Sequence, residues 1–439
     1  MSLSGELFDL VASKEISRED LEAAALFALD AVASAVAGAR TPQGEILRRW
    51  GRKVGAAGGD TVRDAGRRAF LLGGLTHILE VDDLHRDSVV HPGCVTVPAV
   101  WAAAEADFGK GDGRELLSAI LWGFEATTRV GMAVGPAHYR IFHNTATCGP
   151  FGSAMAVARL LGLGRVQAVD ALGNAGTQAA GLWQFLDSGA MSKHLHAGRG
   201  AEAGLVAAEL AALSFTGPPE ILEGARGFFA GLCPDGDPTR VLGEPDAPWQ
   251  LHRTSIKPWP SCRHTHPAID AAQEIRQALA RDGRGTSEIA AVDVTAYQAA
   301  LDLCDRPDPR TVYDAKFSLQ HAVAAALSRD KVDFGAFGDE ARDECAKLRA
   351  CATVAAAPRY EAAYPAHWGS AVTVRLKDGG VHSAERGDAK GDPEMPLSAD
   401  EIVDKARRLI EFGQYPEPDA LIEGILALAD GGPLPRLAI

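Results

Sequence analysis

The sequence is poor in aromatic residues and in positive charge. Aromatics make up 6% of the chain, and 44 Lys and Arg face 58 Asp and Glu, which gives a formal net charge of −14. An excess of negative charge opposes binding to nucleic acid or to anionic membranes through general electrostatics, so we expect neither partner. A site for an anionic ligand would need a local group of cations within this acidic chain.

The sequence also has no CxxC motif. Its seven cysteines are an odd number and are scattered along the chain. This pattern is typical of reduced thiols in the cytoplasm rather than of a disulfide framework. The first residues, MSLSGELFDLVASKE, lack the basic and then apolar regions of a signal peptide. The most apolar run, 21–39, is rich in alanine and is interrupted by Asp30, so we expect a cytoplasmic protein without a membrane segment.

Helical spacing of apolar residues dominates the first 250 residues. A Ser-x-x-acid capping box, Ser17 to Asp20, precedes an apolar helical pattern that ends at Gly38. Further helices are predicted, with Gly or Pro between them, at 63–79, 98–108, 114–132, 147–162, 166–181 and 200–214.

The pattern changes near residue 235, where PDGDPTRVLGEPDAPW has no period. Beyond it, two strand-like patterns, the second with a hairpin turn at Asp378, alternate with two helical patterns: 289–297, 371–385, 267–281 and 315–328. Capped helical patterns return from Ser398. We predict a mainly α protein with a large discontinuous all-helical domain, 1–252 and 397–439, and a smaller α+β domain, 253–396.

Four stretches concentrate carboxylates, imidazoles and cations within otherwise apolar sequence. They are VDDLHRDSVVHPG (81–93), RIFHNTATCGP (140–150), SGAMSKHLHAGRG (188–200) and SIKPWPSCRHTHPAID (255–270). For each stretch alone, a solvated loop between helices is the simpler interpretation. Taken together, they predict one polar site.

The first stretch could serve as a metal site or as an acid/base pair. Asp83 and Asp87 are four residues apart and could share a helical face with His91 nearby, as metal ligands would. The Pro-Gly pair after His91 would break such a helix, and no standard ligand spacing is present. We therefore favour His91 as a general acid/base, oriented by the carboxylates of Glu80 and Asp83, and predict no metal.

In the second stretch, His143 precedes a small-residue helix start that contains Thr145. The simpler interpretation is that a threonine caps the helix. The functional one is that the free N–H groups of the helix N-terminus bind a substrate carboxylate, with Thr145 beside it.

The third and fourth stretches supply cations. Lys193 and His196 lie among small residues that allow a ligand to approach closely, and Lys257 and Arg263 flank a proline-rich turn. Arginine pairs with a carboxylate through its planar fork, and lysine offers a mobile charge. Such groups in an acidic chain predict a site for a small di- or tricarboxylate, and proton abstraction next to a carboxyl group is the natural first step.

At these stretches the sequence resembles the MmgE/PrpD family, which includes 2-methylcitrate dehydratase, cis-aconitate decarboxylase and iminodisuccinate epimerase. The resemblance covers almost the whole chain. It rests on E-x-D-D before the HPG turn at 91–93, FHNTAT (142–147), GLWQFLDSGAMSKHLHAG (181–198), SFTGPPEILEG (214–224), KPWPSCRHTHPAIDA (257–271) and YDAKFSLQHAVAAAL (313–327).

The resemblance implies a helical domain completed by the C-terminal helices, an α+β lid, an active site in the cleft and a homodimer. The family's active-site positions fall on His91, His143, Lys193 and Lys257. Glu80 stands where decarboxylase-like members have Asp.

Two further family positions concern substrate binding. Tyr313 aligns with a family tyrosine. Leu84 replaces a threonine that dehydratase and decarboxylase members carry, so a hydroxyl is missing here.

We therefore expect a cofactor-independent enzyme that removes a carbon-bound proton from a small di- or tricarboxylate. The first expectation is a 2-methylcitrate dehydratase-like lyase. The alternatives are an epimerase of a substituted succinate, which Leu84 favours, and a cis-aconitate-type decarboxylase. A protein that binds carboxylates without catalysis is the alternative of another class.

Overall fold

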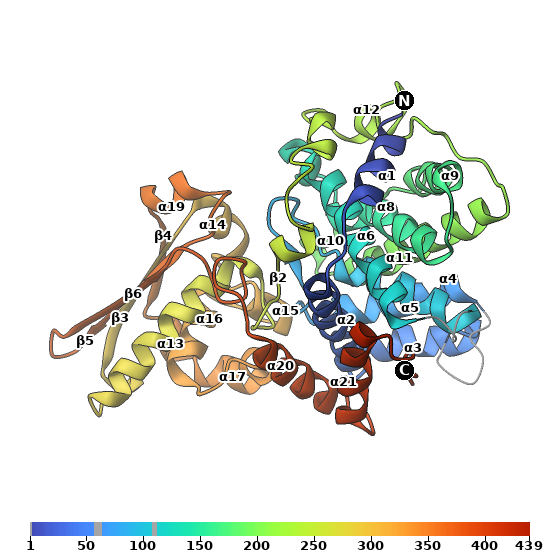
Figure 1. Ribbon diagram of the computed structural model, residues 1–439. Helices are drawn as coiled ribbons and strands as arrows, with labels where there is room; N and C mark the ends of the chain where they lie inside the picture. Colours follow the sequence, from blue (N-terminus) through green and yellow to red (C-terminus); the bar gives the residue numbers. More distant parts are fainter. Residues whose placement is uncertain (1, 57–63, 108–111) are drawn as a thin grey trace. The chain divides into compact units, whose positions relative to one another are not determined.

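The computed structural model of the chain describes residues 2–56, 64–107 and 112–439 (Figure 1). Two compact units are formed, unit 1 by residues 1–256 with 398–439 and unit 2 by residues 257–397. Helices hold 60% of the residues and strands 8%, which confirms the prediction of a mainly α protein with a smaller α+β part.

Unit 1 is helical. Its α-helices are α1 (Leu3–Ser13), α2 (Arg18–Gly38), α3 (Pro42–Val54), α4 (Ala65–His77), α5 (Gly93–Asp107), α6 (Gly113–Met132), α7 (Pro136–Tyr139), α8 (Asn144–Leu160), α9 (Arg165–Gly176), α10 (Phe185–Ser188), α11 (Ser192–Ala212), α12 (Phe228–Leu232), α20 (Ala399–Phe412) and α21 (Pro418–Leu426). One short antiparallel pair joins β1 (Leu84–His85) to β2 (Thr254–Ser255).

The buried helix α2, near the N-terminus, packs against the C-terminal helix α20 of the same unit. Ser17 and Asp20 form its predicted capping box. The C-terminal helix α20 packs against it (Figure 1), and buried Lys405 of α20 pairs with buried Asp30 of α2. The Lys405 ammonium also donates to the carbonyl of Val81, at 2.7 Å. The last helices of the chain therefore support the acidic turn that contains Glu80 and Asp83.

Helix α2 is long and apolar enough to cross a membrane by length and composition. However, 78% of its most apolar window is buried inside the protein, and a core helix of a soluble protein passes the same test. The alanine-rich run at 21–39 therefore lies, up to Gly38, in a helix in the interior of unit 1.

Small residues allow α11 to approach its neighbours closely. A Cβ atom at Gly198 would lie 2.6 Å from the carbonyl of Phe70 in α4, and one at Gly204 would lie 2.2 Å from the Ser153 hydroxyl in α8. Such distances exclude a side chain at either position. The close packing brings the N-terminal turns of α11 next to the end of α4 and the start of α8.

Unit 2 contains one four-stranded sheet. Its strands are β3 (Ile289–Ala296), β4 (Ala352–Ala356), β5 (Ser370–Leu376) and β6 (Val381–Arg386), in the order β4-β3-β5-β6. Only the β3–β4 pair is parallel. The remaining α-helices are α13 (His266–Arg281), α14 (Gln298–Cys304), α15 (Val312–Lys316), α16 (Leu319–Ser328), α17 (Asp339–Glu344), α18 (Ala346–Arg349) and α19 (Pro358–Ala363).

The elements of unit 2 follow the apolar pattern of the sequence. Val292 and Val294 of β3 and Val372 and Val374 of β5 are buried on the same sheet face and share one core with α13 and α16. The predicted strand at 289–297 and the hairpin at 371–385 are confirmed. Strand β4 was not predicted, because three of its five residues are alanine and the stretch shows no alternation of strongly apolar and polar residues.

Several helix limits differ from those predicted. Helix α11 begins at Ser192 rather than at residue 200, so the stretch read as a loop, SKHLH, is helical. The helix expected at 166–181 ends at Gly176, and the one expected from residue 98 begins at Gly93, with Pro98 inside it. The predicted ends at residues 63 and 108 lie outside the described residues.

Candidate active site

Four buried histidine rings of unit 1 form a continuous cluster. His77 ends α4, His91 precedes α5, His143 is the N-cap of α8, and His196 lies in the first turns of α11. The ring centroids are 4.6 Å apart for His77 and His91, 5.7 Å for His77 and His143, and 5.5 Å for His143 and His196. The structure thus brings together three histidines that the sequence predicted and one, His77, that it did not.

The protonation of His91 follows from its hydrogen bond. Its Nδ1 lies 2.5 Å from the main-chain oxygen of Asp83. A carbonyl can only accept, so Nδ1 must carry a proton, and Nε2 is the nitrogen that can exchange a proton with a ligand. The carboxylate of Asp82 lies 3.6 Å from the same Nδ1 and stabilises a positive ring.

Two carboxylates that were predicted to orient His91 also contact other groups, and the predicted orienting roles stay predictions. Asp83 orients His91 through its main chain, while its carboxylate accepts from the N–H of Gly93 at 2.9 and 3.1 Å. The Glu80 carboxylate binds the ammonium of Lys193 at 2.6 and 2.7 Å. The sequence shows the density of acids in this turn but not which nitrogen each acid reaches.

The pair of Glu80 and Lys193 provides a fixed cation. Both side chains are buried, with 6% and 9% of their surface exposed. Glu80 has φ of 59°, a left-handed conformation that is uncommon for residues other than glycine. A buried charged side chain needs a partner with good geometry, and the two contacts with Glu80 hold the Lys193 Nζ atom in place.

His143 and His196 are neutral rings. Burial, followed by the charge of Lys193, holds the pKa of His143 well below its usual 6.5. Burial, followed by the charge of His77, lowers the pKa of His196 to about 4. At neutral pH His143 is therefore an uncharged imidazole next to a cation, which is the state that a general base requires.

His77 and Asp82 were missed as a pair by the sequence analysis. The Nδ1 atom of His77 lies 2.7 Å from Asp82 Oδ2. Its Nε2 atom is buried and has no hydrogen-bond partner among the described residues. Buried polar atoms without partners are uncommon, and in this cluster the group that pairs with Nε2 can be a ligand. The sequence offered only a weak signal for this pair, namely a histidine at the end of a helical pattern followed five residues later by an aspartate.

Helix α8 supports the His91 turn. The Thr145 hydroxyl accepts from the N–H of His91 at 3.1 Å, and the Asn144 amide donates to the carbonyl of Ser88 at 2.8 Å. Thr145 is fully buried, and no threonine side chain caps α8. This contact favours a supporting role for Thr145 over the predicted contact with substrate.

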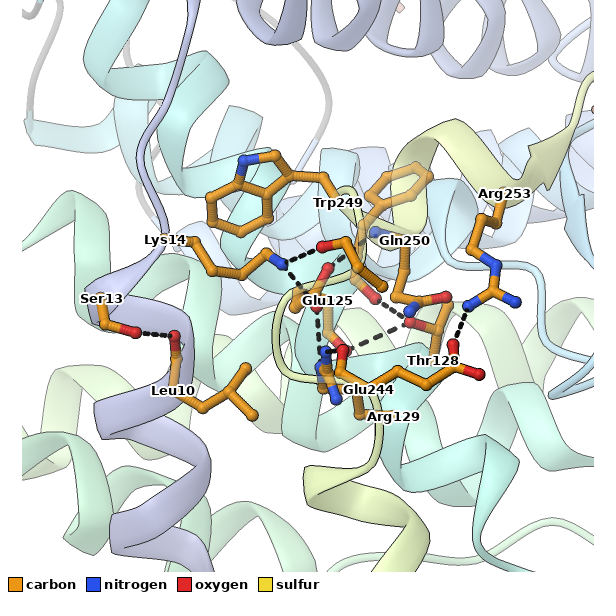
Figure 2. Close-up of polar contacts among 12 residues, drawn as sticks. Leu10, Ser13, Lys14, Glu125, Thr128, Arg129, Glu244, Trp249, Gln250 and Arg253 are labelled. Carbon is orange, nitrogen blue, oxygen red and sulfur yellow. Dashed lines mark hydrogen bonds and ion pairs between the residues drawn. The ribbon is translucent and has the colours of Figure 1, made fainter.

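A second buried network holds the other side of this turn (Figure 2). Glu125 accepts from Arg129 Nε and from the N–H of Gln250, both at 2.7 Å, and Arg129 also donates to main-chain oxygens of the 241–244 segment. The Gln250 side-chain oxygen lies 3.1 Å from His85 Nε2. The network therefore connects α6 to β1, seven residues or fewer from His91.

The predicted residues of unit 2 have local partners. Lys257 is 1% exposed. The guanidinium of Arg263 pairs with Asp392 at 2.5 Å, which favours a structural role over carboxylate binding. Tyr313 stacks on Phe317 with centroids 4.7 Å apart. Roles of these residues toward a substrate stay predictions.

A metal remains to be considered, because His77, Asp82 and His91 offer ligand atoms within 4.8 Å of one another. The proton on His91 Nδ1 leaves Nε2 as the ring nitrogen that could bind an ion. This set differs from the acids that the sequence suggested, Asp83 and Asp87. The absence of a metal stays a prediction.

Comparison with known proteins gives the family context. Residues 7–241 match the model of the MmgE/PrpD N-terminal domain and residues 259–427 that of the MmgE/PrpD C-terminal domain. A cis-aconitate decarboxylase of Aspergillus terreus is 28% identical over 285 residues, which cover 61% of this chain and 58% of that enzyme.

Two further relatives align over more of their length. The cis-aconitate decarboxylase of Homo sapiens is 25% identical over 354 residues, 77% of this chain and 71% of that protein. The cis-aconitate decarboxylase-like protein oryM of Aspergillus oryzae is 27% identical over 423 residues, 90% and 87% of the two chains.

Proposed function

The chain belongs to the MmgE/PrpD family, and on that premise we propose that it is a cofactor-independent lyase acting on a small di- or tricarboxylate. The observation that carries the proposal is the neutral His143 beside the fixed ammonium of Lys193. A base and a cation so arranged suit removal of a proton next to a carboxyl group.

The proposed reaction uses two histidines in opposite states. His143 removes the carbon-bound proton, and the Lys193 ammonium stabilises the negative charge that develops on the carboxyl group. His91, whose positive form is stabilised by Asp82, donates from Nε2 to the departing hydroxide, which leaves as water. Environments that favour a neutral ring in one place and a charged ring in another assign base and acid.

Dehydration of a 2-methylcitrate-like substrate is the first reaction proposed. Decarboxylation of a cis-aconitate-like substrate is the second, and the names of the relatives support it. Epimerisation of a substituted succinate is supported by Leu84, which places a buried apolar side chain where a hydroxyl would otherwise stand. In dehydration and epimerisation His143 removes the carbon-bound proton and the later step differs. Decarboxylation instead begins with loss of CO2, and a side chain must then give a proton to the resulting carbanion.

Turnover in deuterated water tests the proposed function. The protein is incubated with 2-methylcitrate, citrate, cis-aconitate and substituted succinates, and substrates and products are followed by NMR. We expect conversion of at least one compound, or incorporation of deuterium into it, because proton abstraction leads to one or the other and decarboxylation places a solvent-derived deuteron on carbon. Absence of both across the panel would leave a binding protein without catalysis as the better explanation.

Treatment of the protein with a chelator tests whether the reaction needs a bound metal ion. Pre-treatment with a chelator should leave the rate unchanged, since the proposed reaction uses only side chains of the protein as acid, base and cation. A rate that disappears and returns with a divalent ion would instead assign the ion to His77, Asp82 and His91.

We further propose that the protein is a cytoplasmic homodimer. Large apolar side chains are exposed on unit 1, among them Leu213 at 82%, Phe215 at 56% and Val166 at 75%. Exposed apolar surface of this kind supports association with a second copy. Light scattering should give about twice the mass of one chain, and Leu213→Glu should lower it; a wild-type mass equal to that of one chain would refute the dimer.

A further inference from the structure

His143 and His196 face each other with the same ring nitrogen. Their Nδ1 atoms are 3.3 Å apart, and both side chains are buried, 1% and 9% exposed. A hydrogen bond between two such nitrogens needs one proton, because one nitrogen donates and the other accepts. The two rings must therefore be in opposite tautomers when both are neutral.

The surroundings isolate this pair from most of the solvent. Trp183 packs on His143 with centroids 4.6 Å apart, and Phe185 packs on His196 at 5.5 Å. Gly181 accepts from the N–H of His143, and a Cβ atom there would lie 2.4 Å from the Cβ of Ala146 and 3.3 Å from His196 Nδ1. A residue without a side chain is thus required where the two rings meet.

We propose that His196 is a proton relay for His143, and the proposal rests on the proposed function. In the starting state His143 donates from Nδ1 to His196, so that its Nε2 lone pair is free to accept the substrate proton. After that transfer the Nδ1 proton moves to His196 Nδ1, and His196 releases its own Nε2 proton to water. One proton passes from substrate to solvent, and both rings end neutral.

The relay also converts His143 from base to acid. After one passage His143 carries its proton on Nε2, the nitrogen that faced the substrate, and can return a proton to the reacting carbon. His196 keeps a larger exposed fraction than His143, which makes it the exit toward solvent. In this proposal His196 is a positioning and relay residue, and its predicted contact with the substrate stays a prediction.

Isotope exchange separates a relay from a structural role. For a compound of the panel that the wild type converts, the ratio of solvent deuterium gained by recovered substrate to product formed is measured at partial conversion. In His196→Asn the amide can still bond to His143 but cannot pass a proton through a ring. We expect that ratio to fall by about tenfold or more, because an abstracted proton that cannot leave returns to its carbon.

Matched variants complete the test. His194→Asn, two residues earlier in α11, should leave the ratio unchanged. His196→Phe, which keeps a ring without hydrogen bonds, should lower turnover further than His196→Asn. A ratio in His196→Asn equal to that of the wild type would overturn the relay, even where turnover falls.

A measurement without substrate distinguishes failure of the relay from failure of the proposed function. Long-range 1H–15N spectra of the 15N-histidine-labelled protein report which ring nitrogen is protonated. We expect one ring of the pair to carry its proton on Nδ1 and the other on Nε2. Two rings both protonated only on Nε2 would refute the relay whatever the activity, whereas the expected pattern in a protein inactive on the whole panel would refute only the proposed function.

Discussion

Lys193→Met combined with Glu80→Gln should reduce turnover by about 10²–10³-fold, the loss typical of removing one group that stabilises developing negative charge. Methionine keeps most of the lysine volume, and glutamine removes the carboxylate that would otherwise be buried without its partner. Steady-state rates on the compound that the wild type converts give the measurement, and the far-UV circular dichroism spectrum should be unchanged.

Two comparisons make this result specific. Arg199→Met removes a cation of the same helix from an exposed pair with Glu202, and should leave turnover within about twofold. His143→Ala, which removes the base while Lys193 stays, should lose activity to a similar extent as the Lys193 variant. Near-normal turnover in both site variants would remove the basis for the proposed active site.

Arg129→Met should lower the free energy of unfolding by about 3–5 kcal/mol, the range for breaking a buried ion pair, because Glu125 then keeps only the more distant ammonium of Lys14, 3.7 Å away. Both side chains of the Glu125–Arg129 pair are fully buried (Figure 2), and Arg129 also serves main-chain oxygens that would lose their donor. Urea titration followed by tryptophan fluorescence, together with the thermal midpoint, measures the change.

The matched control lies in the same network. Arg253→Met removes the exposed pair with Glu244 and should cost no more than about 1 kcal/mol. Replacing both buried partners, Glu125→Leu with Arg129→Met, should recover part of the loss, because the buried carboxylate is removed as well, while Lys14 keeps its hydrogen bond to the Ala247 carbonyl. If Arg129→Met and Arg253→Met lowered the free energy of unfolding equally, burial of the ion pair would not explain the loss of stability.

Local signals in the sequence predicted much of the fold. The capping box at Ser17 fixes the start of α2, and the Asp-Gly-Gly turn after Asp378 fixes the β5–β6 hairpin, because both motifs act within a few residues. The start of α11 was misplaced because Lys193 in a first helical turn opposes the helix dipole. The compensating carboxylate, Glu80, is 113 residues away, and no local pattern shows it.

The sequence likewise predicted some features of the candidate site and missed others. The residue types predicted that His91, His143 and Lys193 would share a site, and unit 1 brings them together around His77. The partners were less predictable, since a main-chain oxygen orients His91 and Thr145 holds its backbone. Such contacts depend on the path of the chain, which composition and spacing do not encode.

The contact of Lys405 with the Val81 carbonyl has a consequence for the timing of assembly. During synthesis the ribosome makes the four histidines early and α20 only after the whole of unit 2. The ammonium that supports the backbone between Glu80 and Asp82 is therefore among the last groups to reach its place. A nascent chain without α20 would lack this support, so the order of synthesis delays completion of the turn between Glu80 and Asp82 until α20 has been made.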